Sequence, residues 1–258
     1  MQYETITRED RDGMALVTLR RPDVMNALNT QMRAEITHAV GAAATEARAV
    51  VLTGEGRAFC SGQDLGDRAN AANINLERTL RDEYIPMLMA MVDCPVPVIA
   101  AVNGTAAGAG ANLALAADIT IAAEGASFIQ AFGRIGLIPD AGGTWLLPRT
   151  VGLQKAMGAA LFADRITARQ AADWGMIWEA VPDDAFEATW RARAEQVASG
   201  PTEAFKRVKR AMQASFGNTL REQLLLEGQL QGECGETRDF KEGVVAFLEK
   251  RKPVFEGR

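Results

Sequence analysis

The segment GRIGLIPDAGGTW, residues 133–145, places one acidic side chain, Asp140, between an apolar run and two adjacent glycines. An ionised carboxylate among apolar groups costs free energy unless it is paired, hydrogen-bonded or shifted in pKa. Burial raises the pKa of a carboxyl group toward the working range of a general acid or base, so Asp140 is a candidate for proton transfer. The alternative is an ordinary turn, in which Asp140 bonds its own backbone and glycine supplies a positive φ.

Two glycine-rich turns could bind a negatively charged oxygen through backbone N–H groups. The segments GRAFCSGQDLGD, residues 56–67, and NGTAAGAGANL, residues 103–113, each follow a predicted strand, and the second leads into a predicted helix. Two such turns can direct one N–H each at the same oxygen, which is how an oxyanion hole is built. The spacing matches neither the nucleotide P-loop nor the dinucleotide fingerprint. Close packing of a helix on a sheet is the alternative for the second turn.

For two other candidate reactive side chains, Cys60 and His38, the sequence context favours structural roles. Cys60 has no histidine in its segment to activate it, so a small buried thiol is the favoured interpretation. His38 is the one histidine of the sequence and lies in a helical pattern, where we expect a partly exposed residue. One histidine excludes a histidine-pair metal site or an HExxH protease within a single chain. We expect no metal.

Composition indicates a globular protein with a large core. The 258 residues are 48% hydrophobic and 24% charged, and the net charge of -5 argues against a nucleic-acid partner. The three cysteines form no C-x-x-C pair, as expected in a reducing cytoplasm. We find no signal-peptide pattern and no apolar run long enough to cross a bilayer, so we expect a cytoplasmic protein without a membrane partner.

Strand-like and helical segments alternate through the first 200 residues. Predicted strands at 14–20 and 47–53 enclose a predicted helix at about 30–46, and further strands are predicted at 96–102 and 117–124. This alternation is typical of an α/β protein with crossover connections. Residues 151–181 predict two helices followed by one more strand, with Thr167 as a candidate N-cap of the second helix.

The character of the sequence changes after Gly200. Three helical segments begin near Pro201, Thr219 and Thr237. A helical tail of this length cannot bury its own apolar faces, so it must pack on the core or on another subunit. We therefore divide the chain into an α/β core, 1–200, and a helical segment, 201–258, and expect a homo-oligomer.

An ordered set of six motifs makes a resemblance specific. The motifs are RRPDVMNALNTQM (20–32), FCSGQDL (59–65), VNGTAAGAGANLALAADI (102–119), GLIPDAGGTWLLPRTVG (136–152), ADWGMIWEAV (172–181) and EGVVAFLEKRKPVF (242–255). This order resembles the crotonase, or enoyl-CoA hydratase/isomerase, family over nearly the whole chain. The resemblance implies a spiral of ββα units followed by a C-terminal helical segment that forms trimers, often paired into hexamers.

The resemblance assigns roles to residues of both glycine-rich turns. It implies that the backbone N–H groups of Gln63 and Ala109 hold the thioester oxygen of an acyl-CoA substrate. Alanine at 109, where the family has glycine, keeps this donor provided that φ stays negative. The resemblance also implies further substrate- or CoA-binding positions, with coenzyme A entering as part of the substrate and no separate cofactor. These positions are Met25, Ala27, Asp64, Leu65, Phe132, Phe247 and Lys250.

Departures from the family pattern bear on the reaction. Hydratases of the family resemble one another in two glutamates that hold a water, and the matching positions here are Asn112 and Phe132. In isomerase-type members a single acid carries the proton, and in one branch, which acts in phenylacetate degradation, it is an aspartate at the position of Asp140. An ordinary core role for Phe132 and a solvated role for Lys250 are the alternatives. We therefore expect an acyl-CoA isomerase, with a hydratase, a thioester hydrolase or a non-catalytic acyl-CoA-binding oligomer as alternatives.

Overall fold

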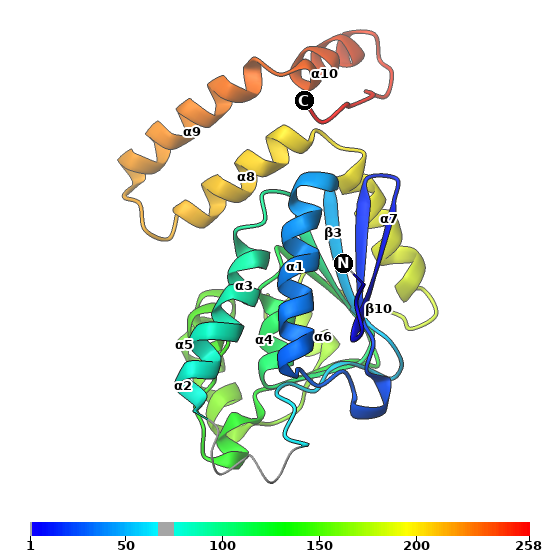
Figure 1. Cartoon of the computed structure of the whole chain (residues 1–258). Coiled ribbons are helices and arrows are strands. Elements are labelled where there is room, and N and C mark those ends of the chain that lie inside the picture. Colours follow the sequence, from blue (N-terminus) through cyan, green and yellow to red (C-terminus); the bar gives the residue numbers. More distant parts are fainter. Residues whose placement is uncertain (1, 67–74) are drawn as a thin grey trace.

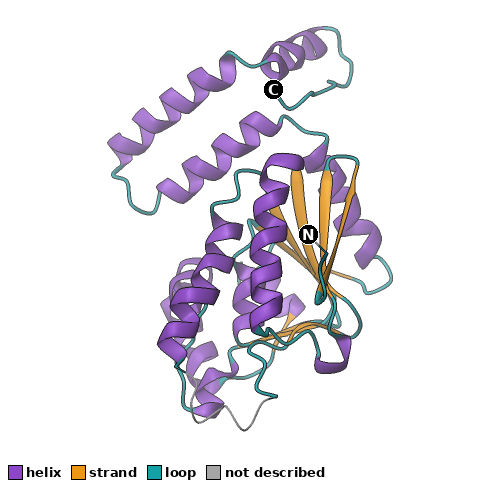
Figure 2. Ribbon diagram, in the orientation of Figure 1, coloured by secondary structure: helices purple, strands orange, loops and turns teal. Residues whose placement is uncertain are grey.

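The computed structural model describes residues 2–66 and 75–258, which form a mixed α/β fold (Figures 1 and 2). The larger sheet has six strands in the order β1-β2-β3-β5-β7-β10, and all neighbouring pairs except β1 and β2 are parallel. Its strands are β1 Ile6–Arg11, β2 Met14–Leu19, β3 Ala49–Gly54, β5 Val98–Val102, β7 Ile119–Ala123 and β10 Glu179–Val181.

A smaller sheet in the order β4-β6-β8-β9 lies at one end of the larger one (Figure 2). Its strands are β4 Ala58–Cys60, β6 Thr105–Ala107, β8 Ser127–Ile129 and β9 Ile166–Thr167. Along the chain, each of β3, β5 and β7 is followed by a strand of the smaller sheet and then by helical structure. This repeat is the spiral of ββα units that the resemblance implies, and the predicted α/β fold class is confirmed.

Helices surround both sheets. They are α1 Thr30–Glu46, α2 Leu76–Thr79, α3 Ile85–Val92, α4 Ala109–Leu115, α5 Gly143–Phe162, α6 Ala168–Asp173, α7 Phe186–Ala198, α8 Thr202–Ala214, α9 Leu220–Gly235 and α10 Arg238–Leu248. A π-helix, Leu80–Tyr84, connects α2 to α3, and a 3₁₀-helix, Ala131–Ile135, follows β8. Helices α1 and α7 flank the larger sheet (Figure 1). Among the helices of the described ranges, none is long and apolar enough to cross a membrane.

The turns between the two sheets depend on glycine. A Cβ on Gly54 would lie 2.6 Å from the carbonyl oxygens of Ala58 and Phe59, and a Cβ on Gly104 would lie 2.2 Å from that of Arg57. A larger residue at 104 would push the β5–β6 turn away from the β3–β4 turn, and one at 54 would open the β3–β4 turn itself. The two turns therefore fix how β4 and β6, which carry the glycine-rich segments, lie against each other.

The helices after residue 200 begin where the sequence predicts. Thr219 and Thr237 accept hydrogen bonds from the backbone N–H groups of Glu222 and Phe240 as N-caps, and Pro201 precedes α8. Helix α8 is tied to the core by Lys209, whose ammonium group lies 2.8 Å from the carboxylate of Asp118, the residue that precedes β7. Helices α9 and α10 extend away from the core (Figure 1).

Candidate active site

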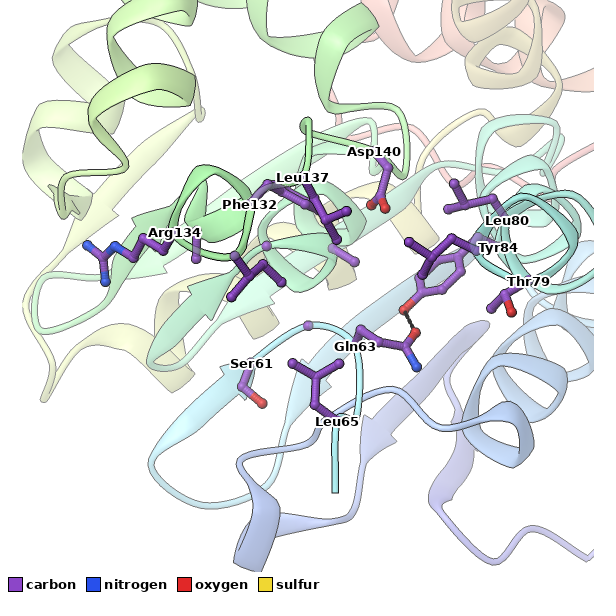
Figure 3. Close-up of a pocket in the computed structure, with 16 residues that line it drawn as sticks. Ser61, Gln63, Leu65, Thr79, Leu80, Tyr84, Phe132, Arg134, Leu137 and Asp140 are labelled. Atoms are coloured by element: carbon purple, nitrogen blue, oxygen red, sulfur yellow. Dashed lines mark hydrogen bonds between the residues drawn. The ribbon is translucent and has the colours of Figure 1, made fainter. Parts of the chain in front are cut away.

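A cavity of about 280 Å³ opens where the smaller sheet ends (Figure 3). Strands β4, β6 and β8 are parallel, so their carboxyl ends meet at one edge, and the segments that follow them supply most of the lining. The segment from Leu76 to Tyr84 closes another side. The lining side chains are mainly apolar with a few polar groups among them, which is typical of a site for a small molecule.

Two backbone amides lie at the bottom of this cavity. In the parallel bridge between Leu28 and Gln63, the N–H of Leu28 bonds the carbonyl of Gly62 and the N–H of Asp64 bonds the carbonyl of Leu28. Because peptide groups alternate in direction along an extended chain, the N–H of Gln63 points away from Leu28. Ala109 is the first residue of α4, so its N–H has no acceptor inside the helix.

Gly62 brings the two amides together. Its φ is +94°, and a Cβ built on it would lie 2.8 Å from the carbonyl oxygen of Ala107 and 3.3 Å from the nitrogen of Ala109. The φ of Ala109 itself is not positive, so alanine is accommodated there without strain. Close backbone packing at Gly62 thus places the segments that carry the amides of Gln63 and Ala109 next to each other at the cavity.

Asp140 lines the same cavity from the loop between the 3₁₀-helix and α5, on the side opposite Gln63 (Figure 3). Its carboxylate forms no ion pair with any residue of the described ranges. Burial among apolar neighbours raises the pKa of Asp140 to about 6, and a bond from its own backbone N–H only partly opposes this. A carboxyl group with this pKa can take and return a proton near neutral pH.

The raised pKa of Asp140 predicts that this residue destabilises the folded protein. Below the ordinary pKa of 3.8 the carboxyl group is neutral in both folded and unfolded chains, and above about 6 the folded chain carries a charge that burial disfavours. We expect Asp140→Asn to raise the free energy of unfolding at pH 8 by on the order of 1 kcal/mol, after discounting for solvent screening. At pH 3.5 the gain should vanish. Urea unfolding at both pH values measures this, and an equal effect at both would contradict it.

A buried polar network supports the Gln63 segment. The Tyr84 hydroxyl donates to the side-chain oxygen of Gln63 at 2.6 Å (Figure 3). Arg33 donates to the same oxygen at 3.0 Å. Arg33 also forms an ion pair with Glu83 and bonds the carbonyl of Leu28. Burial raises the pKa of Tyr84, so its phenol stays protonated and donating. Sequence reasoning missed Tyr84 and Arg33, because only the fold brings them to Gln63.

The predicted substrate-binding residues fall into three groups. Leu65 and Phe132 line the cavity, and Phe132 is also almost fully buried, so its contact with the cavity and its core role coexist. Met25, Ala27 and Asp64 flank it without lining it. Burial opposes ionisation of Asp64, but the N–H of Gly66 and the ion pair with Arg21 outweigh burial and lower the pKa of its carboxyl group. Phe247 and Lys250 lie at the end of α10 and the structure does not bring them to the cavity. Helix α10 lies at the opposite end of the molecule from α2, which borders the cavity (Figure 1).

The remaining candidates have structural surroundings. Cys60 is fully buried, which raises the pKa of its thiol to about 12 and keeps it protonated, as the interpretation of an inert thiol predicts. His38 is exposed on α1 and bonds the hydroxyl of Tyr3. Asn112 is fully buried and does not line the cavity.

The fold and this pairing of backbone amides with a carboxylate define the class of protein, and comparisons with known proteins agree. Residues 9–258 match the enoyl-CoA hydratase/isomerase family, and the chain belongs to that family. It is 63% identical over the full length of both chains to a protein of Rhodobacter capsulatus described as a probable enoyl-CoA hydratase. It is 43% identical to the 1,2-epoxyphenylacetyl-CoA isomerase of Escherichia coli, over 99% of each chain.

A solved structure shows the same fold. The enoyl-CoA hydratase from Bacillus anthracis is 32% identical and superposes with a TM-score of 0.91, covering 99% of this chain and 100% of that one. The chain is thus an enzyme of the enoyl-CoA hydratase/isomerase family, with a family-typical C-terminal set of helices.

Proposed function

We propose that this enzyme is an acyl-CoA isomerase that moves a proton, and with it a double bond, along the acyl chain of a CoA thioester. The observation that carries the proposal is that Asp140 is the single carboxylate among the described residues lining the cavity, which Gln63 and Ala109 also line. The positions that would hold the two acids of a hydratase are instead a buried amide, Asn112, and a phenyl ring, Phe132.

The mechanism follows from these positions. The N–H groups of Gln63 and Ala109 bind the thioester oxygen and stabilise the enolate that forms when a proton leaves the carbon next to the carbonyl. Asp140 takes this proton as a base and then donates it to a carbon farther along the conjugated system. The apolar walls, including Leu65 and Phe132, exclude water from the enolate.

The likeness to the E. coli isomerase supports a wider substrate range. The name of that relative gives 1,2-epoxyphenylacetyl-CoA as its substrate. In our proposal, opening such a ring epoxide to an oxepin uses the same oxyanion hole at the thioester and the same single acid. Phe132 and the neighbouring apolar residues offer a wall for a ring as well as for an alkyl chain. We therefore include ring-epoxidised phenylacetyl-CoA among the proposed substrates.

Hydration is the second candidate, because the R. capsulatus relative is described as a probable hydratase. In this reaction Asp140 alone would activate the water that adds to a 2-enoyl thioester. Hydrolysis of the thioester would likewise use water activated by Asp140. A non-catalytic acyl-CoA binder is disfavoured, because a buried acid beside the acyl chain costs stability and adds nothing to binding.

A substrate panel separates these functions. Purified enzyme is given 3-enoyl-CoA, 2-enoyl-CoA and epoxidised phenylacetyl-CoA, and products are followed by absorbance and mass spectrometry. Double-bond migration or oxepin formation as the fastest reaction supports the isomerase. Dominant formation of 3-hydroxyacyl-CoA, or release of free CoA, would replace it with the hydratase or the hydrolase.

We also propose that the chain forms a trimer, or a hexamer of two trimers, through its C-terminal helices. After residue 200 many large apolar side chains are exposed, which is unusual for a surface that stays in water. They include Val208, Met212, Phe216, Leu220, Leu224, Leu225, Phe240, Val244, Val245, Phe247 and Leu248. A further apolar set on α5, including Leu153, Met157 and Leu161, offers additional surface.

This proposal predicts the effect of a charge on α9. Leu225 is 67% exposed, and Leu225→Glu should not harm the isolated fold but should place a charge in a subunit contact. We expect light scattering to show a loss of the oligomer, while Arg221→Glu, an exposed change on the same helix, leaves the mass unchanged. A wild-type chain that is already monomeric would refute the proposal directly.

The position of Lys250 leads to a related prediction. Because Lys250 and Phe247 lie far from the cavity of their own chain, they can bind the nucleotide end of CoA only at the cavity of a neighbouring subunit. We expect Lys250→Ala to raise KM for CoA thioesters several-fold with little change in kcat, as for a contact made equally in ground and transition states. Lys252→Ala is the matched control, and an unchanged KM at position 250 would indicate a solvated lysine.

A further inference from the structure

Asn112 holds the backbone of the catalytic loop from inside the core. Its side-chain nitrogen donates to the carbonyl oxygen of Asp140 at 2.7 Å, and the N–H of Gly143 donates to the same oxygen at 2.9 Å. The next residue, Ala141, has a left-handed φ of +48°. The peptide group that follows Asp140 is therefore fixed from two sides, and with it the direction in which the Asp140 side chain leaves the backbone.

Gln130 sets the orientation of the Asn112 amide. Its nitrogen donates to the side-chain oxygen of Asn112 at 2.8 Å, which leaves the nitrogen of Asn112 facing Asp140. Both side chains are fully buried. The remaining oxygen of Gln130 has no hydrogen-bond partner among the described residues. A buried polar atom without a partner costs free energy, so this arrangement is maintained at the expense of stability.

The second glycine of the PDAGG turn makes room for this contact. A Cβ on Gly143 would lie 2.4 Å from the side-chain nitrogen of Asn112. Gly142, by contrast, has a φ of +83° and provides the left-handed turn. The two adjacent glycines thus serve different purposes, one for the turn and one for the approach of an amide to the backbone of Asp140.

We infer that Asn112 and Gln130 are positioning residues that aim the Asp140 carboxylate at the substrate through the backbone of its loop. The inference rests on the proposed proton-transfer role of Asp140. Asn112 does not line the cavity, so it acts on the reaction only through Asp140. We call these two side chains, Asn112 and Gln130, the clamp. A shift of a catalytic group by about 1 Å can lower the rate on the order of 10²-fold, which is the largest loss that we expect when the clamp is removed.

The first test replaces Asn112 with an apolar residue of similar shape. Asn112→Leu removes the bond to the Asp140 carbonyl and adds no charge. We expect kcat for double-bond migration to fall roughly 10- to 100-fold while KM stays within about threefold, because the oxyanion amides remain in place. The pH at which kcat is half-maximal should also move below about 6, because a released loop exposes the carboxylate that burial now shifts.

The matched control is Asn103→Leu. Asn103 also holds backbone groups by its amide, bonding the carbonyl of Gly56 and the N–H of Gly54, but it does not line the cavity. Its replacement should lower thermal stability without moving the pH profile. Should Asn112→Leu fail to fold, Gln130→Leu provides the same test with Asn112 retained, since the amide of Asn112 then loses its fixed orientation.

The outcomes separate this inference from the proposed function. If Asp140→Asn abolishes turnover but Asn112→Leu and Gln130→Leu keep both kcat and the pH profile of the wild type, the clamp is structural only and the inference is wrong. If Asp140→Asn itself retains turnover, the proposed function fails first. Support requires that both clamp variants lower kcat and that the double variant is no slower than the worse single one, as for residues acting through one contact.

Discussion

Asp140→Asn should abolish double-bond migration while leaving substrate binding intact. Asparagine keeps the shape of the side chain but cannot take a proton, so kcat should fall by roughly 10²–10⁴, the range ascribed to general acid–base catalysis. KM should change little, because the backbone N–H groups of Gln63 and Ala109 hold the thioester oxygen. Steady-state kinetics with a 3-enoyl-CoA measure both constants.

The pH profile of the wild type gives an independent check on the same residue. The base must be ionised to accept the proton, and burial raises the pKa of Asp140 to about 6. Activity should therefore rise with pH, reach half of its maximum near pH 6 and level off above it.

An Asp140→Asn variant that retains more than about a tenth of wild-type turnover would contradict the catalytic role and return Asp140 to the role of a turn residue.

Gly62→Ala should damage the oxyanion hole without touching a catalytic side chain. The added Cβ would lie 2.8 Å from the carbonyl oxygen of Ala107 and 3.3 Å from the nitrogen of Ala109, and neither backbone atom can rotate away. The Gln63 segment must then move away from Ala109, so one N–H no longer reaches the enolate oxygen. We expect kcat to fall by roughly 10²–10³, as when one oxyanion donor is lost.

Gly152→Ala is the matched control for this substitution. Gly152 also has a positive φ, +76°, but a Cβ there would meet nothing within 4 Å, and the residue lies in α5 away from the cavity. Gly152→Ala should lower thermal stability, because alanine strains the backbone at a positive φ, without lowering kcat. Equal activity of folded Gly62→Ala and Gly152→Ala enzymes would show that the two amides do not act together.

Elements with clear local signals were predictable from the sequence. Helix α1 begins after Asn29, whose side chain accepts a bond from the N–H of Met32, and the predicted helix at about 30–46 is confirmed. The caps Thr167, Thr219 and Thr237 are likewise confirmed. The short strands β4, β6 and β8 were not predicted separately, because three residues carry no periodicity. Yet their ends supply most of the cavity.

The candidate site was predictable only in part, because most of its contacts come from the fold and not from a local sequence pattern. Asp140 could be chosen from its apolar surroundings, and the structure shows the burial that this choice assumed. Gln63 and Ala109 came only from the resemblance, since a backbone donor leaves no mark on residue type. The contacts of Tyr84 and Asn112 join segments far apart in the chain. No local sequence pattern predicts these contacts.

The most direct measurement of the central claim follows a labelled proton. A 3-enoyl-CoA carrying deuterium on the carbon next to the thioester is converted in ordinary water, and the 2-enoyl-CoA formed in the first turnovers is examined by mass spectrometry and NMR. If Asp140 alone takes and returns the proton, part of the deuterium must appear on the carbon that gains hydrogen. Absence of deuterium from that carbon, with the abstracted label lost to water, or a 3-hydroxyacyl product in place of the 2-enoyl-CoA, would contradict a one-carboxylate isomerase.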